Sequence, residues 1–180
     1  MLPVFARDIL HAGPQGMGLL RMAPAVGAVA TGIYFSVRPL RTNVGVKMLT
    51  AVAVFGAATI VFGVSRSMPL SLACLALLGS ADMLSVYVRQ SLIQLYTPDA
   101  MRGRVGAVAT LFVSGSNELG EAESGFLAAA IGPVAAVVAG GIGAVAVTLL
   151  WSRIFPELRN ARTFEPPQTL EDAPLQESAT

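Results

Sequence analysis

The chain has 180 residues, of which 54% are hydrophobic and 13% charged, and its mean hydropathy is +0.66. Soluble domains carry about 25% charged residues, so this composition argues against a soluble globular protein. The net charge is +1, and the basic residues are spread along the chain rather than gathered on one face, which argues against nucleic-acid binding. The chain has a single Cys (Cys74) and a single His (His11), which argues against a disulfide, a zinc site or a histidine triad. We therefore expect no catalytic residues, no metal and no cofactor.

The first fifteen residues predict the end of an earlier helix followed by a loop. The run MLPVFARDILHAGPQ begins apolar and then becomes polar at Arg7, Asp8 and His11. Its apolar part is too short for the hydrophobic region of a secretory signal, and no Lys or Arg precedes it. We expect residues 1–15 to be a stub of a preceding helix with an external loop.

Five apolar stretches follow, each long enough to cross a membrane. We expect these helices at residues 16–36, 44–64, 70–96, 104–131 and 134–155. A helix of about 20 residues spans the roughly 30 Å hydrocarbon core. Pro24 lies inside the first stretch, where membrane helices tolerate proline because neighbours satisfy the freed carbonyl. The pattern predicts an all-α polytopic membrane protein with about five transmembrane helices, packed closely through its many glycines.

The composition changes abruptly after the last apolar stretch. Trp151 and Arg153 lie near its end, as interfacial anchors do. Residues 156–180 are rich in Pro, Glu, Gln, Ser and Thr and contain few apolar side chains. Such a segment cannot bury enough surface to fold, so we expect a disordered tail.

The basic residues predict the orientation of the chain. With five spans, one side of the membrane receives Arg38, Arg41, Lys47, Arg102, Arg104, Arg153, Arg159 and Arg162, and the other receives Arg7 and Arg66. Short loops rich in Lys and Arg stay in the cytoplasm. We therefore expect the N-terminus outside the cell and the C-terminal tail in the cytoplasm.

The fourth stretch carries ionisable residues at a depth where membrane helices are normally apolar. At 100° per residue, one stripe holds Ser114, Glu118, Glu121 and Gly125, with Asn117 and Ser124 beside it. Ionisable groups inside a bilayer are costly, which predicts a polar site that faces other helices. Two interpretations stay open for Glu118 and Glu121, with Asn117 as a hydrogen-bonding neighbour. They either line a transport pathway and couple protons, or hold helices together.

Other charged residues lie in or beside the expected spans. Asp82 falls near the middle of the third stretch, and Arg89 follows on nearly the same face. We favour a structural pair between Asp82 and a basic or amide neighbour, with a place in the transport pathway as the alternative. Arg21, near the start of the first stretch, is a candidate intramembrane partner for Glu121 or Glu123, although Glu123 is rotated away and is expected at the interface.

The loop at 98–104, Pro-Asp-Ala-Met-Arg-Gly-Arg, is the most specific local signal. Asp99 is suited to a position at or near a helix N-cap, where a carboxylate complements the helix dipole. Arg102 and Arg104 can donate to carbonyls at neighbouring helix ends, and Gly103 and Gly106 permit close packing. We interpret Asp99, Arg102 and Arg104 as a cytoplasmic loop clamp, with an ordinary basic membrane loop as the alternative.

These motifs resemble the major facilitator superfamily. The resemblance rests on the P-D-x-x-R-G-R loop, on S-x-S-N-E-L-G-E-x-E-S-G in the span that follows it, on the opening LPVFARDIL-HAGPQGMGLL and on the closing LLWSRIFPELRNA. It covers about residues 2–164. Within the superfamily the chain looks like the bacterial branch of drug and siderophore exporters related to the enterobactin exporter.

The resemblance implies that the chain supplies helices eight to twelve of a twelve-helix transporter, with a stub of the seventh. In such proteins the cargo pathway lies between two halves near the membrane midplane. It further implies a bacterial inner-membrane exporter of a small amphipathic molecule or siderophore, driven by proton antiport, with lipid, cargo and a missing N-terminal half as partners. The loop at 38–47 lacks the acidic and paired-glycine pattern of the family's signature loop.

The main alternative is a membrane protein that does not transport. It would be either an accessory subunit or an inactive truncated remnant. An intramembrane enzyme is disfavoured, because the sequence offers no serine–histidine, paired-aspartate or metal-ligand arrangement at a workable spacing.

Overall fold

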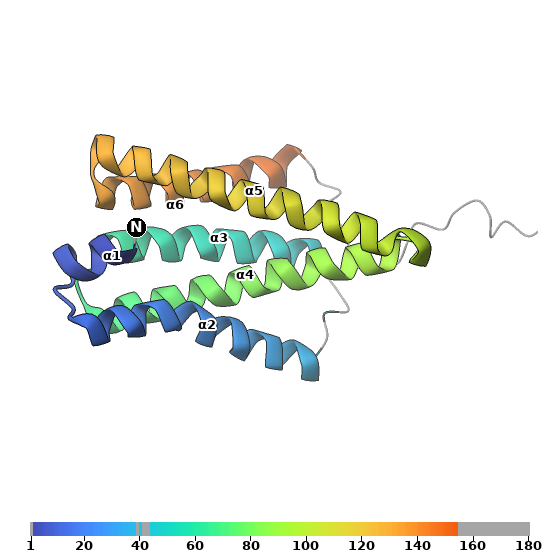
Figure 1. The fold of residues 1–180 in the computed structure, drawn as a ribbon, viewed down its shortest axis with the longest axis horizontal. Coiled ribbons are helices and arrows are strands. Elements are labelled where there is room, and N and C mark those ends of the chain that lie inside the picture. The colour runs from blue at the N-terminus through green and yellow to red at the C-terminus, as the bar shows by residue number, and fades with distance from the viewer. Residues whose placement is uncertain (1, 39, 41–43, 155–180) are drawn as a thin grey trace, which may run out of the picture.

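The computed structural model describes residues 2–38, 40 and 44–154, and its regular structure there is entirely helical. The elements are α1 (Leu2–Val4), the π-helix η1 (Phe5–Ile9), α2 (Pro14–Val37), α3 (Val44–Val64), α4 (Met68–Tyr96), α5 (Asp99–Ile131) and α6 (Pro133–Ile154) (Figure 1). The expected all-α class is confirmed. The tail predicted at 156–180 lies outside the described residues.

Proline and glycine set several of the helix ends. Pro14 and Pro69 lie in the first turns of α2 and α4, and Pro133 begins α6. Proline suits these positions because its missing N–H has no partner in a first turn. Between α5 and α6 the backbone reverses at Gly132, whose φ of +89° is a conformation that favours glycine.

The long helices differ in how well they suit a membrane. By length and composition, α2, α3, α4 and α6 are each apolar enough to span one. The fifth long helix, α5, has 33 residues but does not share this composition. The expected span at 104–131 therefore stays a prediction, although a helix is present there.

Neighbouring long helices contact one another in the order α2, α4, α3, α6 (Figure 1). α2 runs along α4, and α3 lies against both α4 and α6. Two buried clusters lie along these contacts. One contains Phe5, Ala6, Leu20, Ala23, Phe62, Cys74 and Leu75, and the other contains Phe35, Leu40, Val44 and Val88.

Close backbone contact holds the α2–α4 pair together. A Cβ atom added at Gly27 would collide with the carbonyl of Ala76, and one added at Gly79 would collide with the carbonyl of Pro24. Ser80 Oγ donates a hydrogen bond of 3.1 Å from α4 to the carbonyl oxygen of Gly27. Small residues therefore allow these two backbones to touch, as is common between membrane helices.

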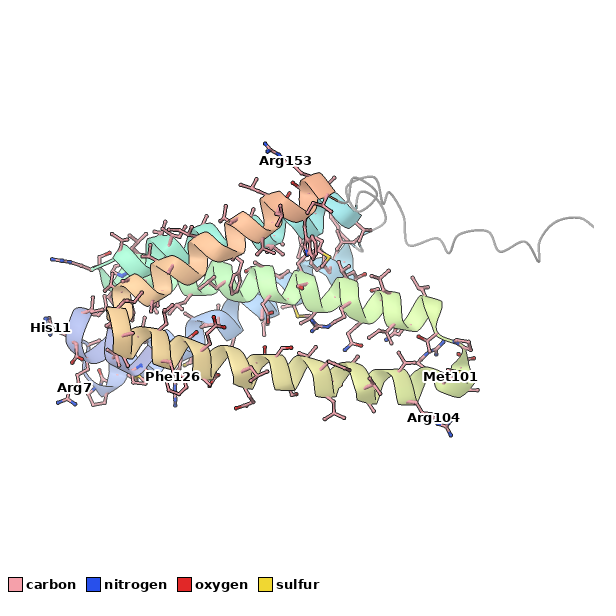
Figure 2. All side chains as sticks on the ribbon, turned by 90° about the horizontal axis from the view of Figure 1, so that it is seen from above. Arg7, His11, Met101, Arg104, Phe126 and Arg153 are labelled. Carbon is pink, nitrogen blue, oxygen red and sulfur yellow. The ribbon has the colours of Figure 1, made fainter. Side chains whose placement is uncertain are left out.

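α5 is packed far more loosely. None of its residues is buried, and it meets α6 at one end and α4 at the other. Figure 2 shows it along one side of the bundle, with Met101 and Arg104 near one end and Phe126 toward the other. No described residue lies within 4 Å of a Cβ added at Gly103 or Gly106, so the described part of the chain shows no close packing at these glycines.

Candidate functional site: a polar cleft between α2 and α5

A cleft of about 720 Å³ lies between the beginning of the chain, α2 and the polar part of α5. It is lined by Leu2, Pro3, Arg21, Ser116, Asn117, Gly120, Glu121, Ser124 and Gly125. Most of these come from α5. Arg21, on α2, is the one cation among the described residues that line the cleft. Three of the polar residues expected in the fourth span, Asn117, Glu121 and Ser124, thus share one cleft.

The spacing along α5 explains why these residues share a face. Asn117, Glu121 and Ser124 are separated by four and three positions, which places them on one side of a helix. The opposite side presents Phe112, Leu119 and Phe126. In the structure these three side chains are 74%, 73% and 79% exposed. α5 therefore has a polar face toward the cleft and an apolar face away from it.

Arg21 and Glu121 bring opposite charges to this cleft. The sequence proposed Arg21 as a partner of Glu121 or Glu123, and the structure places it with Glu121, while Glu123 does not line the cleft. They line the same cleft but form no ion pair, because the two ion pairs among the described residues join Arg7 to Asp8 and Asp99 to Arg102. Both charged groups therefore remain available to a third group in the cleft.

Glu118 lies outside the cleft lining, on an exposed part of α5. The predicted stripe placed it with Glu121, because three residues along a helix differ by only about 60° in direction. The cleft faces the side centred on Asn117 and Ser124, so this rotation carries Glu118 to its edge. Ser116 and Gly120 were not singled out from the sequence. The same helical spacing could have found them, because each lies one residue before Asn117 or Glu121, the polar residues that the sequence analysis named.

Asp82 and Arg89 lie on α4, away from the polar cleft. Asp82 is exposed and makes no ion pair with a described residue. Arg89 lines a separate cavity of about 180 Å³ between α4 and α5, together with Gln90 and Thr110. The structural pair favoured for Asp82 is not formed within the described part of the chain.

Two of the three residues proposed for the loop clamp make contacts where α4 turns into α5. Asp99 Oδ1 and Arg102 Nη2 are 2.5 Å apart, and the same nitrogen donates to the carbonyl oxygen of Gln94 at 3.3 Å. Arg102 thus links the end of α4 to the first turn of α5. Asp99 follows the N-cap residue Pro98 and makes no capping hydrogen bond, so its role is the ion pair and the favourable dipole of the first turn. Arg104 is exposed near the same end (Figure 2).

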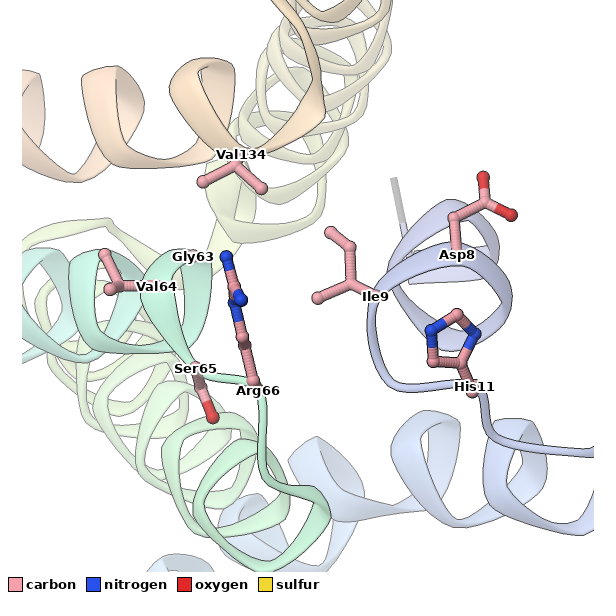
Figure 3. Close-up of a pocket in the computed structure, with 8 residues that line it drawn as sticks. All are labelled: Asp8, Ile9, His11, Gly63, Val64, Ser65, Arg66 and Val134. Carbon is pink, nitrogen blue, oxygen red and sulfur yellow. The ribbon is translucent and has the colours of Figure 1, made fainter.

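A second cavity, of about 490 Å³, lies at the opposite end of the bundle. Asp8 and His11 line one side, and Arg66 reaches across from the α3–α4 turn toward Val134 (Figure 3). His11 has φ +46°, the one positive value at a non-glycine residue in the described ranges. The three ionisable side chains are exposed, so this cavity is an open surface site.

Metal binding finds no support in residues 2–38, 40 and 44–154. That part of the chain holds no group of three or more His, Cys, Asp or Glu side chains that could bind a metal ion. The polar cleft instead offers one guanidinium, one carboxylate, one amide and two hydroxyls. These groups suit recognition of a polar organic molecule through hydrogen bonds and charge.

Comparison with known proteins places the chain in a family. The family model described as "Transmembrane secretion effector" matches residues 1–178. The enterobactin exporter EntS of Citrobacter koseri is 35% identical over 170 residues, covering 92% of this chain and 39% of that protein. EntS of Escherichia coli O1:K1 / APEC is 31% identical over 153 residues, covering 84% of this chain and 36% of that protein.

The chain thus spans less than two fifths of the length of these curated relatives. No solved structure matches it. The family match extends over nearly the whole chain and agrees with the apolar helices of the fold. This multi-pass membrane chain therefore belongs to the transmembrane secretion effector family of the major facilitator superfamily.

Proposed function

We propose that this chain is the C-terminal part of a secondary exporter of a small amphipathic molecule, with a siderophore as the cargo class. The observation that carries the proposal is the cleft that Arg21, Asn117 and Glu121 line between two long helices. The similarity to enterobactin exporters supports the cargo class. Members of the superfamily that this chain belongs to are transporters rather than enzymes.

The cleft offers recognition chemistry for a molecule with both polar and apolar parts. Arg21 carries five N–H donors, Asn117 donates and accepts, and the hydroxyls of Ser116 and Ser124 do both. Leu2 and Pro3 supply apolar surface at one end. An anionic or hydroxyl-rich cargo can bind to the guanidinium and amide while its apolar part contacts the chain's first residues.

Glu121 is the group best placed to couple cargo to protons. When ionised, its carboxylate accepts hydrogen bonds from the hydroxyl groups of a cargo molecule that enters from the cytoplasm. When a proton from the outside binds this carboxylate, that acceptor is lost and the cargo is released. Exchange of one proton for one cargo molecule at this site is antiport. Asn117 acts here as a hydrogen-bonding neighbour.

The other half of such an exporter is the expected partner. α5 has no buried residue, and its glycines at 115, 120 and 125 have open space around them. In transporters of this kind the cargo site lies between two halves. We propose that a chain of six or seven further helices covers α5 and closes the cleft, with the Arg102 end of α5 toward the cytoplasm.

Efflux measurements in cells that lack their own enterobactin exporter test the proposal. The complete transporter containing this segment should restore export, and Glu121→Gln should flatten its dependence on external pH. Glu123→Gln is the matched control, because it makes the same change on the same helix outside the cleft lining. Glu118→Gln measures whether the edge of the cleft contributes. Normal pH dependence in Glu121→Gln would remove the coupling role.

The rival proposal is an accessory or inactive membrane protein that does not transport. Expression of this chain with and without a separate chain of six or seven helices distinguishes the two. Export that requires both chains, together with their co-purification, supports the exporter. Co-purification without export supports an accessory subunit. The absence of both co-purification and export supports an inactive remnant.

The orientation is tested independently of transport. Reporter fusions at Ser67 and after Ile154 should report opposite compartments, with the second in the cytoplasm. The reason is the excess of basic residues at the ends of α2, α4 and α6. The same compartment for both fusions would contradict the arrangement.

A further inference from the structure

A further groove, of about 350 Å³, lies among α2, α3 and α4. Its lining consists of Thr31, Lys47, Thr50, Ala51, Val54, Leu77, Ser80, Ala81 and Leu84. It shares no lining residue with the polar cleft and receives none from α5. Val54 and Leu77, on α3 and α4, are 41% and 51% exposed, so the groove is open on the outer surface of the bundle.

The groove is apolar along most of its length, although it contains hydroxyl groups. Thr50 Oγ1 donates to the carbonyl oxygen of Val46 in its own helix at 2.8 Å. Ser80 Oγ lies 3.1 Å from the carbonyl oxygen of Gly27 and 3.0 Å from that of Ala76. These hydroxyl donors are therefore already used within the protein. The surface that remains is formed mainly by the hydrocarbon parts of aliphatic side chains.

Lys47 gives one end of this groove a positive charge. It lies in the first turn of α3 and is half-buried, and its ammonium forms no ion pair with a described residue. From Lys47 to Val54 the helix rises about 10 Å, so the charge lies at the end of the groove and the aliphatic wall extends deeper along α3. Arg38, exposed at the C-cap of α2, adds a second cation at the same end of the bundle.

We propose that this groove is a binding site for one anionic glycerophospholipid. An acyl chain lies along Val54, Leu77 and Leu84, and the phosphate binds the ammonium of Lys47. Two features support this occupant. A hydrocarbon slot open to the membrane suits an acyl chain. A cation at the membrane surface with no ion-pair partner among the described residues suits an anionic headgroup. The inference does not depend on the exporter function.

Native mass spectrometry of the full chain, released from detergent with defined lipids, tests the proposal. Phosphatidylglycerol and phosphatidylcholine with identical acyl chains are added in turn, and bound lipid is counted. We expect one tightly bound phosphatidylglycerol and weaker binding of phosphatidylcholine. Lys47→Gln should weaken phosphatidylglycerol binding about fivefold, the factor equivalent to about 1 kcal/mol per lysine at an anionic surface.

Matched variants separate the groove from general surface charge. Arg153→Gln removes one positive charge at the same end of the bundle but outside the groove, and should leave binding unchanged (Figure 2). Val54→Phe fills the groove and should reduce binding of both lipids. Val46→Phe adds the same ring at an exposed position of the same helix outside the groove and should not. Lys47→Arg retains the charge and should retain the preference for phosphatidylglycerol.

Several outcomes would overturn the site. Equal binding of the two lipids by the unaltered chain would show that charge has no part in it. Equal losses in Lys47→Gln and Arg153→Gln would indicate general attraction to the protein surface. Unchanged binding in Val54→Phe would exclude the groove. Each variant is first compared with the parent by its helical circular dichroism, and a variant that does not fold is replaced by Thr50→Phe for the groove or Lys47→Met for the charge.

Discussion

The α2–α4 pair and α5 contain similar kinds of residues but use them in opposite ways. In the pair, glycine brings two backbones into contact, at Gly27 against Ala76 and at Gly79 against Pro24. In α5, a Cβ added at Gly120 would meet nothing within 4 Å. Glycine in a membrane helix thus indicates close packing only where a partner helix is present.

This contrast divides the molecule into a scaffold and a working helix. α2, α3, α4 and α6 share an apolar composition and pack against one another, and α2 contributes Arg21 to the cleft. α5 carries most of the polar lining and has no buried residue. A helix held mainly at its two ends can accept a partner or shift relative to the scaffold. The predictions below test whether stability resides in the scaffold contacts.

The largest effect is expected from Gly27→Ala. The added methyl group would collide with the backbone of Ala76, which cannot move aside without separating α2 from α4. We expect a loss of about 3 kcal/mol or more, the upper part of the range for overpacking. The thermal unfolding midpoint in a fixed detergent should fall sharply.

Gly120→Ala is the matched control for this change. It adds the same methyl group to a helix interior, but at a position with open space. Because alanine is the better helix former by about 1 kcal/mol, stability should be unchanged or slightly increased. Equal destabilisation by the two variants would contradict the division into scaffold and working helix.

Sequence patterns predicted the helices well because their ends carry strong local signals. The expected span 44–64 coincides with α3, and the expected span 16–36 differs from α2 (Pro14–Val37) by one or two residues at each end. The expected span at 104–131 lies within α5, which begins earlier, at Asp99. The P-D-x-x-R-G-R segment forms the first turns of the helix, because Pro98 and Asp99 favour a helix start.

The site was less predictable than the helices. Periodicity placed the polar residues of α5 on one side, and Arg21 was a candidate partner because of its place near the start of the first span. Arg21 and Asn117 both line the cleft with Glu121. Periodicity does not specify which part of that side faces α2, so Glu118 was ranked equal to Glu121. The difference depends on the rotation of α5 about its axis. Contacts with other helices set that rotation, and they are separated by many residues in the sequence.

A second, smaller effect is expected at the α3–α6 contact. A Cβ at Gly56 would lie 2.9 Å from the carbonyl oxygen of Gly141, and one at Gly141 would lie 2.8 Å from that of Gly56. Each alanine variant should cost about 1–3 kcal/mol, because a small separation of the helices relieves the overlap. The double variant should cost less than the sum, since one separation relieves both. Additive losses in thermal unfolding would show that the two contacts are independent.

Ser80→Ala tests the hydrogen bond between α4 and α2. The hydroxyl lies 3.1 Å from the carbonyl oxygen of Gly27, and hydrogen bonds between membrane helices average about 0.6 kcal/mol. A modest fall in the unfolding midpoint is expected. Ser36→Ala is the control, because its hydroxyl donates only within α2, to the carbonyl oxygen of Gly32. A loss as large in Ser36→Ala would mean that the interhelical bond adds nothing.

The smallest effect is expected from Asp99→Asn at the α4–α5 turn. The ion pair with Arg102 is solvent-exposed, and such pairs contribute about 0–1 kcal/mol. Arg102 retains its bond to the Gln94 carbonyl, so the turn should persist and the unfolding midpoint should change little. Arg102→Gln, which removes both contacts, should have the larger effect of the two. Because α5 is attached to the scaffold mainly at its ends, a large loss in Asp99→Asn would show that this turn, rather than the α2–α4 contact, limits the stability of the chain.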